Sequence, residues 1–199
     1  MPAFFSYDAP EPPPGMDEHA EWEPSPWMDA PRDELPAVLA TPRILARTDR
    51  VVLSLSRVEI FAVGVRIPID AVVRRRGESH HDWFSLLDQR HGPHPPVDGL
   101  RLGVELADGT RLGTEVEPHH PFREDEPAGP VLVNQGGGGG GGGSRWDLTF
   151  KLWVWPLPPA GTLDVVAEWR VLDVPESRVT LDATLLRDAV GAVQPLWAD

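Results

Sequence analysis

The sequence predicts an all-β protein: an antiparallel, immunoglobulin-like β-sandwich of about eight strands, followed by a short C-terminal helix. Apolar and polar residues alternate in several segments of strand length, which is typical of strands with one buried face. Turns rich in Gly, Pro and Asp separate these segments, and no helical pattern between them offers a parallel crossover. The 199 residues suit one domain with tails.

Residues 1–42 form the first predicted segment, an acidic and Pro-rich tail. This segment holds nine acidic side chains against the single base Arg32, so it accounts for −8 of the formal net charge of −13. Segments with a high net charge and few apolar residues cannot bury enough surface to fold alone. We therefore expect a disordered tail over residues 1–42 and a folded β-sandwich domain over residues 43–199.

Two strands are predicted between residues 51 and 73. The apolar positions of the first strand shift phase partway along it: Val51, Leu53, Leu55, Val58 and Ile60. This shift predicts a β-bulge near Ser56 and Arg57. The alternation from Val63 to Val73 is the most regular in the chain, but Pro68 has no N–H group to donate. The second strand is therefore expected at a sheet edge or at a bulge.

A hairpin follows, with strands from Leu100 to Leu106 and from Leu112 to Val116. The dipeptide Asp108-Gly109 between them predicts a type I′ turn. The segments 75–98 and 117–129 are long predicted loops, and residues 82–90 of the first loop suit one or two helical turns.

The C-terminal part continues the β pattern. Further strands are predicted at Val131–Val133, Trp146–Trp155, Leu163–Trp169 and Arg178–Asp182. The run of eight glycines from 136 to 143 is expected to be a flexible loop. Helical spacing of apolar residues after Asp182 predicts the terminal helix, with Asp182 as its N-cap.

One stretch carries a resemblance to a known group of proteins. It comprises Arg145–Asp147, Trp153–Gly161 with the sequence W-V-W-P-L-P-P-A-G, Glu168-Trp169 and Pro175–Arg178. These residues resemble a group of uncharacterised small proteins from GC-rich Gram-positive bacteria that share a W-P-L-P-P-x-G motif. No activity is known for that group, so the resemblance implies a source and no function.

The histidines suggest a metal site as one hypothesis. Four of them lie in the first long loop beside Asp82 and Asp88, and two lie in the second: His80, His81, His91, His94, His119 and His120. If the two loops converge, imidazoles and a carboxylate could bind zinc or a similar ion. The spacing matches no established metal motif, and a solvated loop explains the same residues. The chain has no cysteine, and no cofactor is expected.

Enzymatic activity is not expected, because no nucleophile lies beside a base with an orienting partner. There is no Gly-x-Ser-x-Gly motif, and the glycine run leads through Ser144 and Arg145 into a strand rather than into the helix of a phosphate-binding loop.

The main functional hypothesis rests on the aromatic residues of the sequence. Trp153 and Trp155 share one face of a strand whose other face is also apolar, so they are either buried or form an exposed aromatic patch. We expect burial, with the C-terminal helix as the cover. Aromatic residues and one methionine also occur at intervals in the acidic tail: Phe4, Phe5, Tyr7, Trp22, Trp27 and Met28. Such a segment suits docking onto a basic, grooved protein partner.

The leading hypothesis is therefore a non-enzymatic cytoplasmic module for protein–protein interaction, with a metal-binding protein or metal-dependent enzyme as the alternative. The charge of −13 opposes binding to nucleic acid and to anionic membranes. No apolar stretch approaches the ~20 residues that a membrane span requires, and the first residues lack a signal-peptide pattern.

Overall fold

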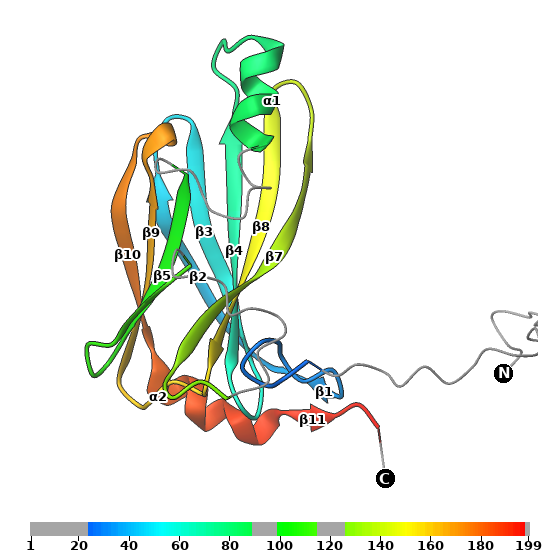
Figure 1. Ribbon diagram of the computed structural model, residues 1–199, viewed down its shortest axis with the longest axis vertical. Coiled ribbons are helices and arrows are strands. Elements are labelled where there is room, and N and C mark those ends of the chain that lie inside the picture. Colours follow the sequence, from blue (N-terminus) through cyan, green and yellow to red (C-terminus); the bar gives the residue numbers. More distant parts are fainter. Residues whose placement is uncertain (1–23, 89–98, 115–125, 198–199) are drawn as a thin grey trace, which may run out of the picture.

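The structure, a computed structural model, describes residues 24–88, 99–114 and 126–197. It is mostly β, with antiparallel sheets and a short C-terminal helix, as predicted. The larger sheet has five strands in the order β2-β3-β4-β8-β7 (Figure 1), with the bounds Ala37–Arg47 (β2), Val51–Ile60 (β3), Val65–Arg74 (β4), Arg145–Trp155 (β8) and Val131–Gly141 (β7).

The smaller sheet has four strands in the order β10-β9-β5-β6, with the bounds Val174–Asp182 (β10), Thr162–Trp169 (β9), Leu100–Leu106 (β5) and Arg111–Gly113 (β6). A two-stranded pair joins β1 (Glu34–Leu35) to β11 (Gln194–Pro195) near the ends of the chain. The helices are α1 (His80–Asp88) and α2 (Ala183–Asp188), with the 3-10 turns η1 (Arg170–Leu172) and η2 (Ala189–Ala192).

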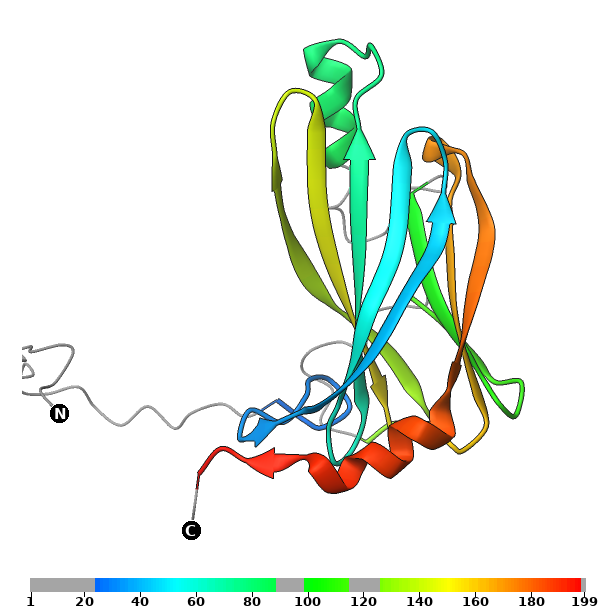
Figure 2. The same ribbon diagram turned by 180° about the vertical axis from the view of Figure 1, so that it is seen from behind.

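The two large sheets face each other across one apolar core (Figures 1 and 2). Alternate residues of each strand point inward, because successive side chains of a strand lie on opposite faces. The core combines side chains of both sheets and of both helices, including Val58, Ile67, Leu152, Val104, Val165, Leu181, Trp83 and Leu186, all buried. The predicted inward set of β9, Leu163, Val165, Ala167 and Trp169, is buried as well.

The predicted bulge in β3 is confirmed. Ser54 pairs with Asp70 and Glu59 pairs with Arg66, so four residues of β3 oppose three of β4. Pro68 is one of those three residues, and β4 lies between β3 and β8 rather than at a sheet edge. The bulge, not an edge position, therefore explains how this strand accommodates a proline.

The hairpin between β5 and β6 differs from the prediction in its turn. The N–H of Leu106 donates to Thr110 O and the N–H of Gly109 donates to Leu106 O, both at 2.9 Å. The loop therefore has three residues, and of these only Gly109 has a positive φ, at 86°. A type I′ turn needs positive φ at both central residues, so the predicted turn is wrong.

The predicted glycine loop over residues 136–143 is also wrong, because Gly136–Gly141 continue β7, and Gly137–Gly141 pair with β8 after a register shift that follows Asn134. A Cβ added at Gly139 would lie 2.4 Å from Leu148 Cδ2 and 2.6 Å from Asp147 O, whereas one added at Gly140 would meet nothing within 4 Å. Close approach of two backbones is a known reason for glycine inside a strand. The chain turns only after the strand, where Gly142 N donates to Arg145 O at 2.9 Å.

The folded part begins earlier than the predicted boundary at residue 43. Strand β2 starts at Ala37, and Ala30 is already buried. Two register shifts in β2, between Ala40 and Arg43 and between Ile44 and Ala46, obscure the alternation that would have marked it as a strand. Residues 1–23 of the predicted tail lie outside the described residues.

Two predictions about helices agree with the structure. Helix α1 lies within the predicted loop 75–98 and begins two residues before the expected helical turns. Asp182 caps α2 as predicted, since its Oδ1 accepts a hydrogen bond from Thr184 N at 2.9 Å. Strand β10 is longer than predicted because it begins at Val174, before a register shift that precedes Ser177. Most of the predicted loop 117–129 lies outside the described residues.

Alanine substitutions in the glycine strand are expected to have opposite effects at neighbouring positions. Gly139→Ala should lower the free energy of unfolding by ~1–3 kcal/mol, because its methyl group would overlap Leu148 and the β8 backbone. Gly140→Ala should leave it unchanged or raise it by ~0.4–1 kcal/mol, because the site is open and alanine restricts the unfolded chain. Urea unfolding measures both values. Equal midpoints would show that the run has no fixed register against β8.

Candidate functional site

Trp153 is fully buried, although its side chain points away from the main core. Its ring packs edge-on against Phe61, with centroids 5.6 Å apart, and its Nε1 donates to Pro26 O at 2.9 Å. A Cβ at Gly64 would lie 2.6 Å from the Trp153 ring, so this glycine makes room for the indole. Trp153 is buried as expected, but the cover is the segment 24–31 and not the C-terminal helix.

Trp155 is half-buried on the same face, and its ring meets Trp27 edge-on at 6.0 Å between centroids. Trp27 and Met28 were predicted to bind a partner, yet both are half-buried. Asp29 helps to fix this segment, since its Oδ1 accepts from Gln135 Nε2 at 2.5 Å. The other predicted tail residues, Phe4, Phe5, Tyr7 and Trp22, lie outside the described residues.

The predicted histidine site is only partly described. His80 and His81 are exposed on the first turn of α1, and the His80 ring lies 4.5 Å from the Phe84 ring. His91, His94, His119 and His120 lie outside the described residues. Within the described ranges, no three His, Asp or Glu side chains gather in a way that could hold a metal ion.

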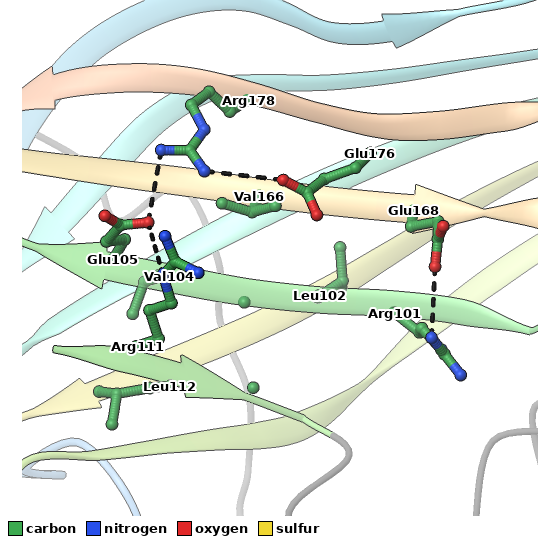
Figure 3. Close-up of a pocket in the computed structure, with 12 residues that line it drawn as sticks. Arg101, Leu102, Val104, Glu105, Arg111, Leu112, Val166, Glu168, Glu176 and Arg178 are labelled. Atoms are coloured by element: carbon green, nitrogen blue, oxygen red, sulfur yellow. Dashed lines mark hydrogen bonds and ion pairs between the residues drawn. The ribbon is translucent and has the colours of Figure 1, made fainter. Parts of the chain in front are cut away.

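The outer face of the smaller sheet carries a hollow that was not predicted. Val166 of β9, Gly103 of β5 and Gly113 of β6 form one row across the sheet, because Gly103 pairs with both of the others. Two neighbouring strands thus present bare backbone beside a half-buried valine. We call this hollow of about 410 Å³ the glycine trough (Figure 3).

One wall of the glycine trough is a branched ion-pair network (Figure 3). Glu105 Oε2 lies 3.0 Å from Arg111 Nε and 3.4 Å from Arg178 Nη1. Arg178 also lies 2.8 Å from Asp164 Oδ2 and 3.7 Å from Glu176 Oε1. The hydrogen bond that Arg178 donates to Asp164 raises the pKa of Arg178, with smaller contributions from the Glu105 and Glu176 charges. Several carboxylates therefore hold this guanidinium in place and in its charged form.

The other wall lies at the opposite ends of β5 and β9 and includes the start of η1. Arg101 Nη1 lies 3.3 Å from Glu168 Oε2, and Glu168 Oε1 accepts from Arg170 Nε at 2.9 Å. The residues lining the trough include no hydroxyl, thiol or imidazole group. The lining supplies fixed charges, bare backbone and an apolar patch, a combination suited to binding a polar or planar group.

A local signal for the trough was present in the sequence. Gly103 occupies an outward position in the middle of a regular strand pattern, where glycine weakens a strand and often marks a close approach by another group. What the sequence did not show is that Gly103 lies opposite Gly113, because the predicted turn implied a different register.

Comparisons of the chain with protein-family models, with curated proteins and with solved structures find no significant match. Of the helices in the described ranges, none is long and apolar enough to cross a membrane.

The cover over Trp153 can be tested by a double-mutant cycle. Trp153→Ala should lower the free energy of unfolding by ~3–5 kcal/mol, as for other buried aromatic residues. Removing residues 1–31 should also destabilise the protein, because it exposes the indole. The combined change should be clearly less than additive, since both changes remove the same contacts. Additive losses in urea unfolding would mean that the segment does not cover Trp153. Trp155→Ala should lower the free energy of unfolding by less, because the Trp155 side chain is half-buried.

Proposed function

We propose that this protein is a non-catalytic interaction module that recognises a protein partner through the glycine trough. The observation that carries this proposal is the row of Val166, Gly103 and Gly113, which leaves a hollow of about 410 Å³ between two sets of ion pairs. The sequence-based hypothesis of an interaction module is retained, but the proposed surface is different, because Trp153 is covered by the chain itself.

The surroundings of the trough match the usual anatomy of a protein interface. An apolar centre with a polar rim is typical, and Arg is enriched at such sites. The ion pairs of Arg101 and Arg178 hold both guanidiniums in place, which reduces the ordering entropy lost on binding. A Cβ at Gly103 would lie 2.9 Å from Leu112 O, so the close approach of β6 requires glycine here and leaves the floor of the trough without a side chain.

The chemistry of the partner follows from the trough and from the net charge. A slim side chain or an extended backbone segment could contact Val166 while exchanging hydrogen bonds with Arg101 and Glu105. The net charge of −13 favours encounter with a basic surface and accelerates association with it. The aromatic tail residues Phe4, Phe5, Tyr7 and Trp22 stay predicted additional contacts.

The shared core supports a two-layer β-sandwich as the architecture of the module. Its strand order differs from the immunoglobulin order. Strands β2, β3 and β4 are neighbours in one sheet, whereas the immunoglobulin fold places its second and third strands in opposite sheets. We therefore propose the sandwich without the immunoglobulin connectivity.

The metal-dependent alternative stays a prediction that rests on the six histidines. Metal analysis of the purified full chain tests it, and a stoichiometric ion would favour it over the interaction module.

Filling the trough with a side chain of the protein itself should separate binding from folding. In Val166→Tyr the ring can lie over the bare backbone of Gly103, an arrangement that stabilises glycine-containing sheets. We expect unchanged or slightly higher stability, and loss of the proteins that the wild-type chain retains from an extract of its native host. Ile44→Tyr is the matched control, because Ile44 is exposed on the outer face of the other sheet. Retention of the same proteins by all three chains would contradict the proposal.

A further inference from the structure

A second hollow lies on the outer face of the larger sheet, at the end where β2 turns into β3 and β4 leaves the sheet. Figure 2 shows these three strands side by side. The hollow has a volume of about 330 Å³, and we call it the arginine hollow because four arginines line it: Arg47, Arg50, Arg74 and Arg76.

Strand pairing explains how the arginine hollow is built. Val52 and Val72 are opposite each other on β3 and β4, both half-buried, and they form an apolar floor. Arg47 pairs with Val52 from the β2 side, and Arg74 follows Val72 by two residues and therefore lies on the same face. The sheet register thus places two exposed guanidiniums beside one pair of valines.

The four arginines differ in how their charge is compensated. Arg76 lies 3.2 Å from Asp49 Oδ2, and Arg50 forms an ion pair with Glu78. Arg47 and Arg74 form no ion pair with any residue that the structure describes. In addition, Arg50 Nε is buried without a hydrogen-bond partner in the described structure. The hollow therefore retains two uncompensated positive charges in a protein whose formal charge is −13.

Glu78 fixes one side of the hollow. Its Oε2 accepts a hydrogen bond from Arg76 N at 2.6 Å, and its backbone carbonyl accepts from Arg75 Nε at 2.9 Å. The Arg76 N–H is the largest of the effects that lower the pKa of Glu78, and the nearby Arg50 charge adds to them. Glu78 therefore stays ionised and forms its ion pair with Arg50. Arg47 and Arg74 are not part of that pair and are available to a ligand.

We propose that the arginine hollow binds a phosphate group carried on a small apolar or aromatic body. Two free guanidiniums match the charge of a phosphate monoester, which is about −1.5 to −2 near neutral pH. Guanidinium forks bind phosphate oxygens in pairs, and Val52 and Val72 offer contact to the organic part. A monoanionic carboxylate would leave one guanidinium without a counter-ion.

The size of the ligand is limited by the rest of the protein. A nucleic acid would bring many phosphates to a protein whose formal net charge is −13, and this overall charge opposes its binding. A single phosphate group avoids that repulsion. The proposal is independent of the glycine trough, which lies on the outer face of the other sheet.

Titration calorimetry of the full chain with phenyl phosphate, inorganic phosphate and benzoate, at one ionic strength, tests the proposal. Phenyl phosphate should bind most tightly, because it engages both guanidiniums and the valine floor. Arg47→Gln and Arg74→Gln should each weaken its affinity by about tenfold or more, as expected for a hydrogen bond between charged groups. Arg57→Gln removes the same charge from an arginine outside the hollow and should leave the affinity unchanged.

The outcomes separate the alternatives. Equal binding of phenyl phosphate and benzoate, or wild-type affinity in both hollow variants, would overturn the proposal. Equal binding of inorganic and phenyl phosphate would show that Val52 and Val72 do not contribute and would overturn the assignment of an apolar or aromatic body. Vesicles of phosphatidylcholine with phosphatidic acid test a lipid as the source of the phosphate, and binding to vesicles without binding to phenyl phosphate would overturn the small-ligand assignment. Unchanged unfolding midpoints in the variants show that the fold is intact.

Discussion

The burial of Trp153 is the constraint on which much of this structure depends. The indole points away from the core between the sheets, so the chain must supply a second cover for the outer face of β8. Residues 24–31 provide it, with the indole N–H bonded to Pro26 O. From there the chain leads into β1, where Glu34 accepts from Ala62 N at 3.0 Å and Asp33 O accepts from Leu196 N at 2.7 Å. The cover over one aromatic side chain thus leads directly into β1, which pairs with Gln194–Pro195.

Local pattern predicted the regular strands well, because alternation of polarity follows directly from a half-buried strand. It also predicted the bulge in β3, since the phase change at Ser56 and Arg57 has no other simple cause. It failed where a long-range partner decides the structure. The two apolar faces of β8 indicated burial but could not identify residues 24–31 as the cover. The glycine run predicts a loop because glycine is a poor strand former, and the run forms a strand only through its pairing with β8.

The alignment of the two glycines in the trough depends on the length of the loop between β5 and β6, which is one residue longer than predicted. A two-residue turn at Asp108-Gly109 would have set Val104 opposite Gly113 and would have mixed inward and outward side chains between the two strands. The observed three-residue loop instead aligns Gly103 with Gly113 and keeps Glu105 beside Arg111 on the outer face. The residues of the trough were visible in the sequence, but their alignment depends on a turn geometry that the sequence signal did not distinguish.

The run of glycines in the second half of β7 also affects how the protein tolerates changes in chain length. In a strand of mixed residues, an insertion moves every later side chain to the other face or to a new neighbour. In the paired tract from Gly137 to Gly141 crowded and open positions alternate and every residue is glycine, so a gain of two glycines re-creates the same alternation against β8. Val131, which is buried, anchors the start of the strand. The added length would then be taken up at the turn that precedes Arg145, and the pairing of β8 with β4 would be unaffected. The tract can therefore gain or lose two residues at the edge of the sheet without losing its alternation against β8, and the change falls on the turn where Gly142 O accepts from Trp83 Nε1.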